Sequence, residues 1–434
     1  MRYGHNSDKW GEHIGSPLPS VMSIFVGTGL CVCPIVIIFG YFVIMTKPHL
    51  VIILPTNFTY TIVEADFDSH IKRGIKMEEV VYFLGAGFSA PFGIPVMSNF
   101  LVKSKDMFSK NSDKYKHLKR IFDEIDKMDK INRFYSMDVD NIEDVLSILE
   151  MNEHIGIGIP GFKKTYTDYI KAVIEYYTPK QKTEEPRLAG PGWFSRIFGY
   201  EKNDLGTALG FFVASIHNLS FQRELQRSGE NIVRFNRDFD LQTHYSIITL
   251  NYDLLLENIC RFIDKKYSTN GGVTFATDIH SIEVDNTNPI LAKLHGSIDT
   301  TIVPPTWNKS DINPNILNAW KLAYKALVEA NYIQIIGYSF PATDTYVKYL
   351  LSSAVMKAFN LKKIDVICKD DSNGTIRKKY KEFINFKYYR FINGDVREYL
   401  FKNYDVCCHP ILLGDHPKKI VMNGLEKAHE AFFI

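Results

Sequence analysis

The most informative part of the sequence is VVYFLGAGFSAPFGIP, residues 80–95. It begins with an apolar run, and Gly85, Ala86 and Gly87 follow directly. With Ala90 these residues complete a G-x-G-x-x-G/A pattern, in which glycines let the backbone approach a pyrophosphate at the start of a helix. The stretch therefore predicts a strand, a phosphate-binding turn and a helix, which together form the first unit of a dinucleotide-binding sheet.

The surroundings of this motif disfavour one common interpretation of it. A dehydrogenase of this kind has an acidic residue about 20 positions further on, at the end of a second strand. Here that neighbourhood is SKDMFSK, residues 104–110, which is not a strand end. The sequence thus disfavours an ordinary nicotinamide-dependent dehydrogenase.

Apolar, β-rich runs recur along the chain and alternate with helical segments. The predicted strands are Val80–Leu84, Ser246–Leu250, Ile290–Leu294, Tyr332–Ile336, Ile364–Cys368 and Tyr388–Phe391. The predicted helices among them are Leu254–Lys265, Ala319–Ala330 and Thr343–Phe359. Continuous apolar runs are typical of parallel strands that are covered on both faces. The alternation predicts an α/β fold with a doubly wound, Rossmann-like, mostly parallel sheet.

A long segment, residues 98–245, lies between the first predicted strand with its glycine motif and the second predicted strand. It has helical spacing and few β signals, and Asn141 suits the N-cap of a helix over IEDVLSILEM. We therefore expect an N-terminal segment at 1–76, a domain at 77–403 that contains this helical insertion, and a tail at 404–434 that serves assembly.

The overall composition is that of a globular protein with a sizeable core. Hydrophobic residues make up 45% and charged residues 23% of the 434 residues, and the formal net charge is +2. This balance gives no reason to expect direct binding of nucleic acid. None of the six cysteines forms a C-x-x-C pair, so we expect a reducing compartment and no structural metal.

The N-terminal run from Val21 to Met45 contains no charged residue. It is long enough to span a bilayer, which takes about 20 apolar residues. We expect a transmembrane helix at 21–45, with the catalytic domain in the cytoplasm beside the inner membrane. An alternative start near Met77 would leave the predicted enzyme intact, and that shorter chain would be cytoplasmic.

Three further motifs each follow a predicted strand. They are ITLNYD with Thr249, Asn251 and Asp253, KLHGS with His295 and Gly296, and IIGYSF with Gly337 and Ser339. Individually, they have ordinary explanations: Asn251 and Asp253 as helix caps, His295 as a structural histidine, and the Gly-x-Ser pair as turn residues. Four such coincidences, all at the carboxyl ends of strands, are far less probable than one shared site.

The four motifs resemble those of the sirtuins, in the same order. The opening motif of that family is matched by Gly85, Ala86, Gly87, Ser89 and Pro95. The resemblance covers about residues 80–370 and implies that the chain uses NAD. It further implies that Asp253 contacts the nicotinamide carboxamide, that Asn251 positions the ribose or a water, and that His295 acts as the general base. The remaining residues would bind the cofactor: Gly85, Ala86, Gly87, Ser89, Pro95, Thr249, Gly296, Gly337 and Ser339.

The chain departs from the deacylase sirtuins after His295. Those enzymes carry a zinc module with two cysteine pairs there, whereas residues 297–317 contain no cysteine. The chain is more similar to the sirtuin-type NAD hydrolases of bacterial antiphage defence. The resemblance therefore implies an NAD glycohydrolase that releases nicotinamide and ADP-ribose. An NAD-dependent protein deacylase and a catalytically silent NAD or ADP-ribose scaffold stay open as alternatives. The resemblance to the NAD hydrolases also implies a homo-oligomer and a partner ATPase, Argonaute or sensor protein.

Overall fold

The computed structural model of the chain describes five strands within residues 23–61. From residue 77 it describes the chain except at residues 132–140, 159–160, 184, 191, 202–203, 238–242, 268–271, 280–287, 304–312, 342–343 and 414–415. The chain divides into two compact units, Met1–Lys76 and Met77–Ile434.

The N-terminal unit contains an antiparallel sheet. Its strands, in order, are β1 (Ser23–Val26), β2 (Cys33–Ile38), β3 (Tyr41–Met45), β4 (Leu50–Thr56) and β5 (Thr59–Thr61). The transmembrane helix predicted at 21–45 is therefore wrong, because three of these strands lie within it. Apolar character alone does not separate strand from helix, and the Val, Ile, Phe and Tyr residues of this run favour strands. Among the residues that the structure describes, no helix is long and apolar enough to cross a membrane.

A six-stranded sheet forms the centre of the second unit, and all its neighbouring strands are parallel. Its strands are β6 (Glu78–Leu84), β9 (Thr243–Thr249), β10 (Ile290–Lys293), β11 (Tyr332–Ile336), β12 (Lys363–Cys368) and β13 (Tyr389–Asn393). All six were predicted from the sequence, to within a few residues at their ends. The spatial order β10-β9-β6-β11-β12-β13 places the first of them in the middle. Because the chain leaves β6 in one direction and later returns to its other side, a topological switch point lies between β6 and β11.

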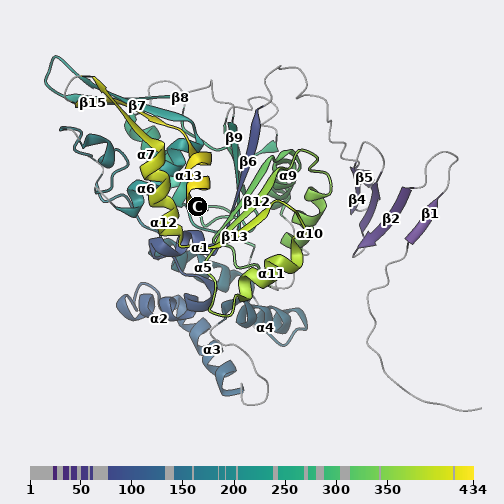
Figure 1. Ribbon diagram of the computed structural model, residues 1–434. Helices are drawn as coiled ribbons and strands as arrows, with labels where there is room; N and C mark the ends of the chain where they lie inside the picture. Colours follow the sequence, from purple (N-terminus) through teal and green to yellow (C-terminus); the bar gives the residue numbers. More distant parts are fainter. Residues whose placement is uncertain are drawn as a thin grey trace, which may run out of the picture. The chain divides into compact units, whose positions relative to one another are not determined.

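Helices cover both faces of this sheet (Figure 1). Side chains of β6 alternate, so that Tyr82 and Leu84 belong to one core cluster and Val81 and Phe83 to the other. The first core is shared with α6 (Leu205–Ile216), α7 (Leu255–Tyr267), α12 (Val396–Cys407) and α13 (Leu425–Phe432). The second is shared with α9 (Pro314–Glu329), α10 (Thr345–Val355) and α11 (Thr375–Phe383). This two-sided cover explains why a strand such as β6 contains a continuous apolar run, Val80–Leu84.

The predicted insertion at 98–245 is mostly helical. Besides α6, it contains α2 (Phe100–Lys110), α3 (Lys119–Ile131), α4 (Ile142–His154) and α5 (Phe162–Tyr177). Asn141 caps α4 as expected, because its side chain accepts a hydrogen bond from the Glu143 N–H at 3.0 Å.

The insertion also contains two strands that the sequence did not indicate, β7 (Leu219–Leu225) and β8 (Asn231–Arg237). They pair with β14 (Cys408–Leu413) and β15 (His416–Met422) in an antiparallel sheet of order β14-β15-β7-β8. The predicted tail at 404–434 thus contributes strands to the same sheet as the predicted insertion.

Candidate active site

The four sequence motifs meet at the carboxyl ends of the parallel strands in the six-stranded sheet. Gly85 follows β6, Asn251 follows β9, His295 follows β10 and Gly337 follows β11. These four strands are neighbours in the sheet. In doubly wound sheets the ligand binds at this edge, beside the switch point.

The loops after β6 and β11 touch at the switch point through glycine backbone. The Gly85 N–H donates to the Ile336 oxygen at 3.0 Å, and the Gly87 N–H donates to the Gly337 oxygen at 2.8 Å. A Cβ on Gly87 would lie 2.7 Å from that oxygen, and one on Gly337 would lie 2.3 Å from the Phe88 nitrogen. Gly337 also has a φ of 65°, which favours glycine. The glycines therefore allow a contact between loops that no other residue would permit.

The helix expected after the glycine motif is only one turn long. It forms α1 (Ala86–Ser89), and a 3-10 turn at Ala90–Phe92 follows. Pro91 lies in that turn, and Gly93, with a φ of 90°, ends it. This turn places the buried Ser89 hydroxyl toward the loop after β9. Pro95 lies just beyond it and is also buried.

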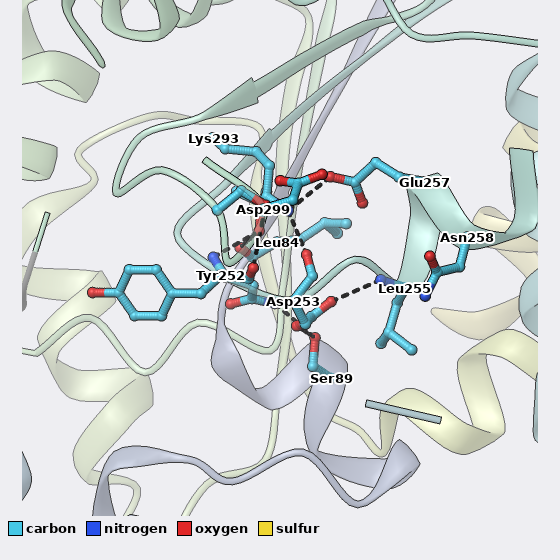
Figure 2. A network of polar contacts seen from close by, with 12 residues as sticks. Leu84, Ser89, Tyr252, Asp253, Leu255, Glu257, Asn258, Lys293 and Asp299 are labelled. Atoms are coloured by element: carbon cyan, nitrogen blue, oxygen red, sulfur yellow. Dashed lines mark hydrogen bonds and ion pairs between the residues drawn. The ribbon is translucent and has the colours of Figure 1, made fainter. Parts of the chain in front are cut away.

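A chain of hydrogen bonds joins the residues predicted for catalysis on the loop after β9. The Asn251 Nδ2 donates to the Gly85 oxygen and to the Ser89 Oγ, both at 2.9 Å. The Ser89 Oγ in turn donates to the Asp253 Oδ2 at 2.6 Å (Figure 2). The hydroxyl of Thr249 links this loop to the end of β6. It donates to the Leu84 oxygen at 3.0 Å and accepts from the Asn251 N–H at 3.1 Å. Both amide hydrogens of Asn251 are engaged, so its Oδ1 is the atom that can accept from a ligand.

Asp253 is held from three directions. Its Oδ1 accepts from the Leu255 N–H at 3.1 Å, at the start of α7, and its other carboxylate oxygen accepts from Ser89. Its main-chain oxygen accepts from the Lys293 ammonium, which also pairs with Glu257 Oε1 at 2.7 Å. Figure 2 shows these side chains converging from β10, α1 and α7. The carboxylate is buried, and both groups that donate to its oxygens are neutral.

His295 lies on the adjacent loop and is buried, with 5% of its surface exposed. Its ring lies 6.2 Å from that of Tyr252, at an interplanar angle of 31°. The loop is tied to Tyr252 because the Ile298 N–H donates to the Tyr252 oxygen at 3.0 Å. Gly296 has a φ of 80°, and a Cβ there would lie 1.8 Å from the Thr301 oxygen. This position therefore requires glycine and fixes the turn that carries His295.

A small cavity opens beside Asn251 and Asp253. Of the residues predicted for the site, Ser89, Thr249, Asn251 and Asp253 line it. The rest of its lining is Leu84, Phe88, Leu255, Leu256, Glu257, Leu291 and Lys293. His295, Gly337 and the exposed Ser339 are on the neighbouring loops and outside that lining.

Two buried carboxylates near the site were not predicted from residue chemistry. Asp344 accepts from the Tyr338 hydroxyl at 3.0 Å, and Glu143, on α4, is buried. Burial raises the pKa of Tyr252 well above its usual value, and the charges of Glu143 and Asp344 raise it further. Burial likewise raises the pKa of Tyr338, and the charges of Asp344 and Glu143 raise it further. The sequence could have indicated them only by position: Glu143 lies in the first turn of a predicted helix, and Asp344 follows shortly after Gly337.

Metal binding is not indicated by the residues around this site. Throughout the part of the chain that the structure describes, no group of three or more His, Cys, Asp or Glu side chains could hold a metal ion. The expectation of a metal-free protein stays a prediction.

Comparison with known proteins identifies the class of this site. Residues 245–389, which span the motifs around Asn251, His295 and Gly337, match the family described as SIR2-like domain. The chain therefore contains a SIR2-like domain, and this implies the use of NAD.

Similarity to solved structures and to curated proteins is weaker. The chain is 13% identical to the complex named "Sir2-p53 peptide-NAD+", with 76% of this chain and 93% of that chain covered and a TM-score of 0.30. It is 14% identical to "Structure of Sir2Tm bound to a propionylated peptide", with the same coverage and a TM-score of 0.27. No curated protein matches the chain in sequence. The class of the site thus rests on the SIR2-like domain and on the site's own geometry.

Proposed function

We propose that this protein hydrolyses NAD to nicotinamide and ADP-ribose. The observation that carries the proposal is the hydrogen-bonded chain from Asn251 through Ser89 to Asp253. This chain lies where β6 and β9 end, and His295 follows the neighbouring strand, β10. The glycine turn after β6, which packs against Gly337 at the switch point, supports NAD as the ligand, because dinucleotides bind beside such a turn in doubly wound sheets.

Each of the three polar residues has a task in this reaction. NAD supplies a cationic nicotinamide as the leaving group. The Asp253 carboxylate accepts from the carboxamide N–H of that ring and holds it in place. The Asn251 Oδ1 accepts from a water on the ribose face and orients it. His295 takes a proton from this water, a role that suits an imidazole.

The bond changes in this step balance. The water oxygen forms a bond to the ribose carbon while the bond from that carbon to the nicotinamide nitrogen breaks. The electron pair of the broken bond neutralises the ring nitrogen, and one proton is released through His295. The products are nicotinamide, ADP-ribose and a proton.

The other predicted residues serve the remainder of the molecule. The backbone of Gly85, Ala86 and Gly87 lies at the switch point, where we place the phosphates. Ser339 and Gly337 would contact the adenosine side, while Thr249, Gly296 and Pro95 shape the loops. Ser89, which we also expect to bind the cofactor, has a second role, because its hydroxyl links Asn251 to Asp253.

The segment after His295 favours hydrolysis over deacylation. Residues 297–317 contain no cysteine, so the zinc module that flanks the peptide site of deacylase sirtuins has no counterpart there. A silent scaffold is disfavoured because a pure binder has no need of the base His295. Incubation with NAD, with and without an acylated peptide, separates the hydrolase from both alternatives.

The biological setting is part of the proposal and rests on the resemblance of the motifs. We place the protein in antiphage defence, as an enzyme that depletes NAD in the cytoplasm when triggered. A homo-oligomer and a partner ATPase, Argonaute or sensor protein belong to the same proposal. Cell fractionation of the full chain beside a chain that begins at Met77 tests the location, and gel filtration of the same two chains tests the oligomer.

The proposed reaction is tested by incubating the purified chain with NAD and separating the products by chromatography. Nicotinamide and ADP-ribose should appear in equal amounts without any peptide, and an acylated peptide should neither speed the reaction nor yield an O-acyl product. NAD consumption only with the acylated peptide would establish the deacylase instead. Binding of NAD without any turnover would establish the scaffold.

A further inference from the structure

The ion pair of Lys293 and Glu257 has no role in the proposed bond-breaking step. Lys293 is the last residue of β10 and Glu257 lies in the first turn of α7. Their side chains are 12% and 19% exposed, and the Nζ and Oε1 atoms are 2.7 Å apart. Both residues line the cavity that Asn251 and Asp253 also line. The pair is therefore part of the site.

The geometry points to Lys293 as a positioning residue for Asp253. Its ammonium spans two elements, because it donates both to the main-chain oxygen of Asp253 and to the Glu257 carboxylate. The side chain of Asp253 is fixed separately by Ser89 and by the Leu255 N–H. We propose that the Lys293–Glu257 pair holds the backbone of Asp253 so that its carboxylate faces the nicotinamide carboxamide, and thereby sets the selectivity for that group.

The chemistry of the two residues suits this task. A lysine ammonium is a compact charge with three donors on a flexible stem, so it can reach a carbonyl oxygen and a carboxylate together. An ammonium with so little exposure needs a charged partner, and Glu257 supplies it. In the first turn of α7, Glu257 also interacts favourably with the helix dipole without any help from Lys293. The helix start thus gains little from the lysine, whereas the Asp253 carbonyl depends on it.

The inference rests on the proposed function and predicts a change in selectivity. A carboxamide can donate an N–H to the Asp253 carboxylate, while the acetyl group of the acetylpyridine analogue of NAD cannot. Loss of a hydrogen bond to a charged group typically costs a factor of about 10 to 100. In Lys293→Met, kcat/KM for NAD should fall by about that factor, while kcat/KM for the analogue should change by less than about threefold. A purely structural role would lower both rates together.

Lys363→Met provides the matched control. Lys363 also lies in a strand of the same sheet, in β12, and pairs with a helix glutamate, Glu430, at 2.6 Å. It is remote in the chain from every predicted site residue and begins its strand, whereas Lys293 ends its own. This variant should keep the wild-type ratio of NAD to analogue.

A second variant protects the test against misfolding. Lys293→Met alone leaves Glu257 poorly exposed and without its cation, so the double variant Lys293→Met/Glu257→Gln removes both charges. It should show the same loss of selectivity. An unchanged ratio of NAD to analogue in a folded variant, when the wild-type enzyme hydrolyses NAD, would overturn the inference.

Ligand binding separates this failure from failure of the proposed function. If the wild-type protein does not hydrolyse NAD, the proposed function is wrong, and the inference is then tested by calorimetry alone. Nicotinamide should bind at least about tenfold more weakly to Lys293→Met than to the wild type, whereas ADP-ribose should bind equally to both. Equal weakening of both ligands, or of neither, would contradict the positioning role.

Discussion

Asp253, on the loop after β9, and Asp365, within β12, are both buried carboxylates, with 7% and 2% of their surface exposed, yet different groups hold them. Asp365, in β12, accepts from Arg390 through two hydrogen bonds of 2.7 Å and contacts the His429 Nε2 at 3.0 Å. Asp253 accepts from a hydroxyl and a main-chain N–H. Asp365 is thus paired with a cationic side chain, whereas both donors to the Asp253 carboxylate are neutral.

The network around Asp365 fastens the last helix to the sheet. Arg390, on β13, also donates to Glu430 at 2.9 and 3.0 Å, and both Glu430 and His429 belong to α13. Burial alone would raise the pKa of Asp365, but hydrogen bonds from Arg390 and His429 outweigh it and lower that pKa. Asp365 therefore joins β12 to β13 and α13, whereas Asp253 lies on a loop beside the candidate site.

The largest expected effect separates the two regions by activity. His295→Ala or Asn251→Ala should lower the rate of NAD hydrolysis by a factor of about 10² to 10⁴, because each removes a group that acts in the transition state. Asp365→Asn should keep the rate of the folded wild type. Product formation measured by chromatography at a temperature where all variants are folded gives the comparison. Wild-type turnover in His295→Ala would show that the site is misassigned.

The next effect separates them by stability. Removing one partner of a fully buried ion pair costs about 3–5 kcal/mol. The side chain of Arg390 is 34% exposed, so Asp365→Asn should lower the free energy of unfolding by about 2–3 kcal/mol. Urea unfolding of residues 77–434 and of its variant measures this difference. A loss below about 0.5 kcal/mol would mean that the network does not stabilise α13.

A smaller effect appears in the pH dependence of that stability. The pKa of Asp365 is lowered in the folded state, so its stabilising contribution is complete above the unfolded pKa of about 3.9 and disappears as the pH falls through the folded value. The stability difference between the wild type and Asp365→Asn should therefore be constant above about pH 5 and shrink toward zero in acid. Unfolding curves recorded between pH 2 and pH 7 test this. A difference that grows in acid would contradict the assigned direction.

The smallest expected effect concerns metal. A chelator such as EDTA should change neither the rate of NAD hydrolysis nor the melting temperature, because we expect neither the site nor the ion network to hold a metal. Elemental analysis of the purified protein provides the independent measurement. Stoichiometric zinc would refute the metal-free prediction and renew the case for a deacylase.

The parallel sheet could be predicted from the sequence because its strands are covered on both faces. Some of these strands are continuous apolar runs, as in Val80–Leu84, and helical segments lie between them in the sequence. The N-terminal run could not be assigned correctly, because strand and helix share its apolar character. Strands β7 and β8 were missed since half of their pattern is polar and one partner, β15, is distant in the sequence.

The site was predictable where a residue type carried its own chemistry. Asn251, Asp253 and His295 follow strands, and a parallel sheet must bring such positions to one edge. Lys293 and Glu257 gave no comparable signal, because an ion pair between a strand and a helix has no characteristic spacing. The link through Ser89 was equally hidden, since only the short turn of α1 directs its hydroxyl at Asp253.

The pairing of β15 with β7 has a consequence for how the chain folds. It joins residues near 420 to residues near 220, and all strands of the parallel sheet except β6 lie between them in the sequence. Such distant contacts form late, because a long search precedes them, although the entropy of closing a long loop grows only slowly with its length. During synthesis the parallel strands leave the ribosome before β15. We expect the parallel sheet, with the loop that carries His295, to assemble first. The pairing of β15 with β7 should then complete the four-stranded sheet as the last step.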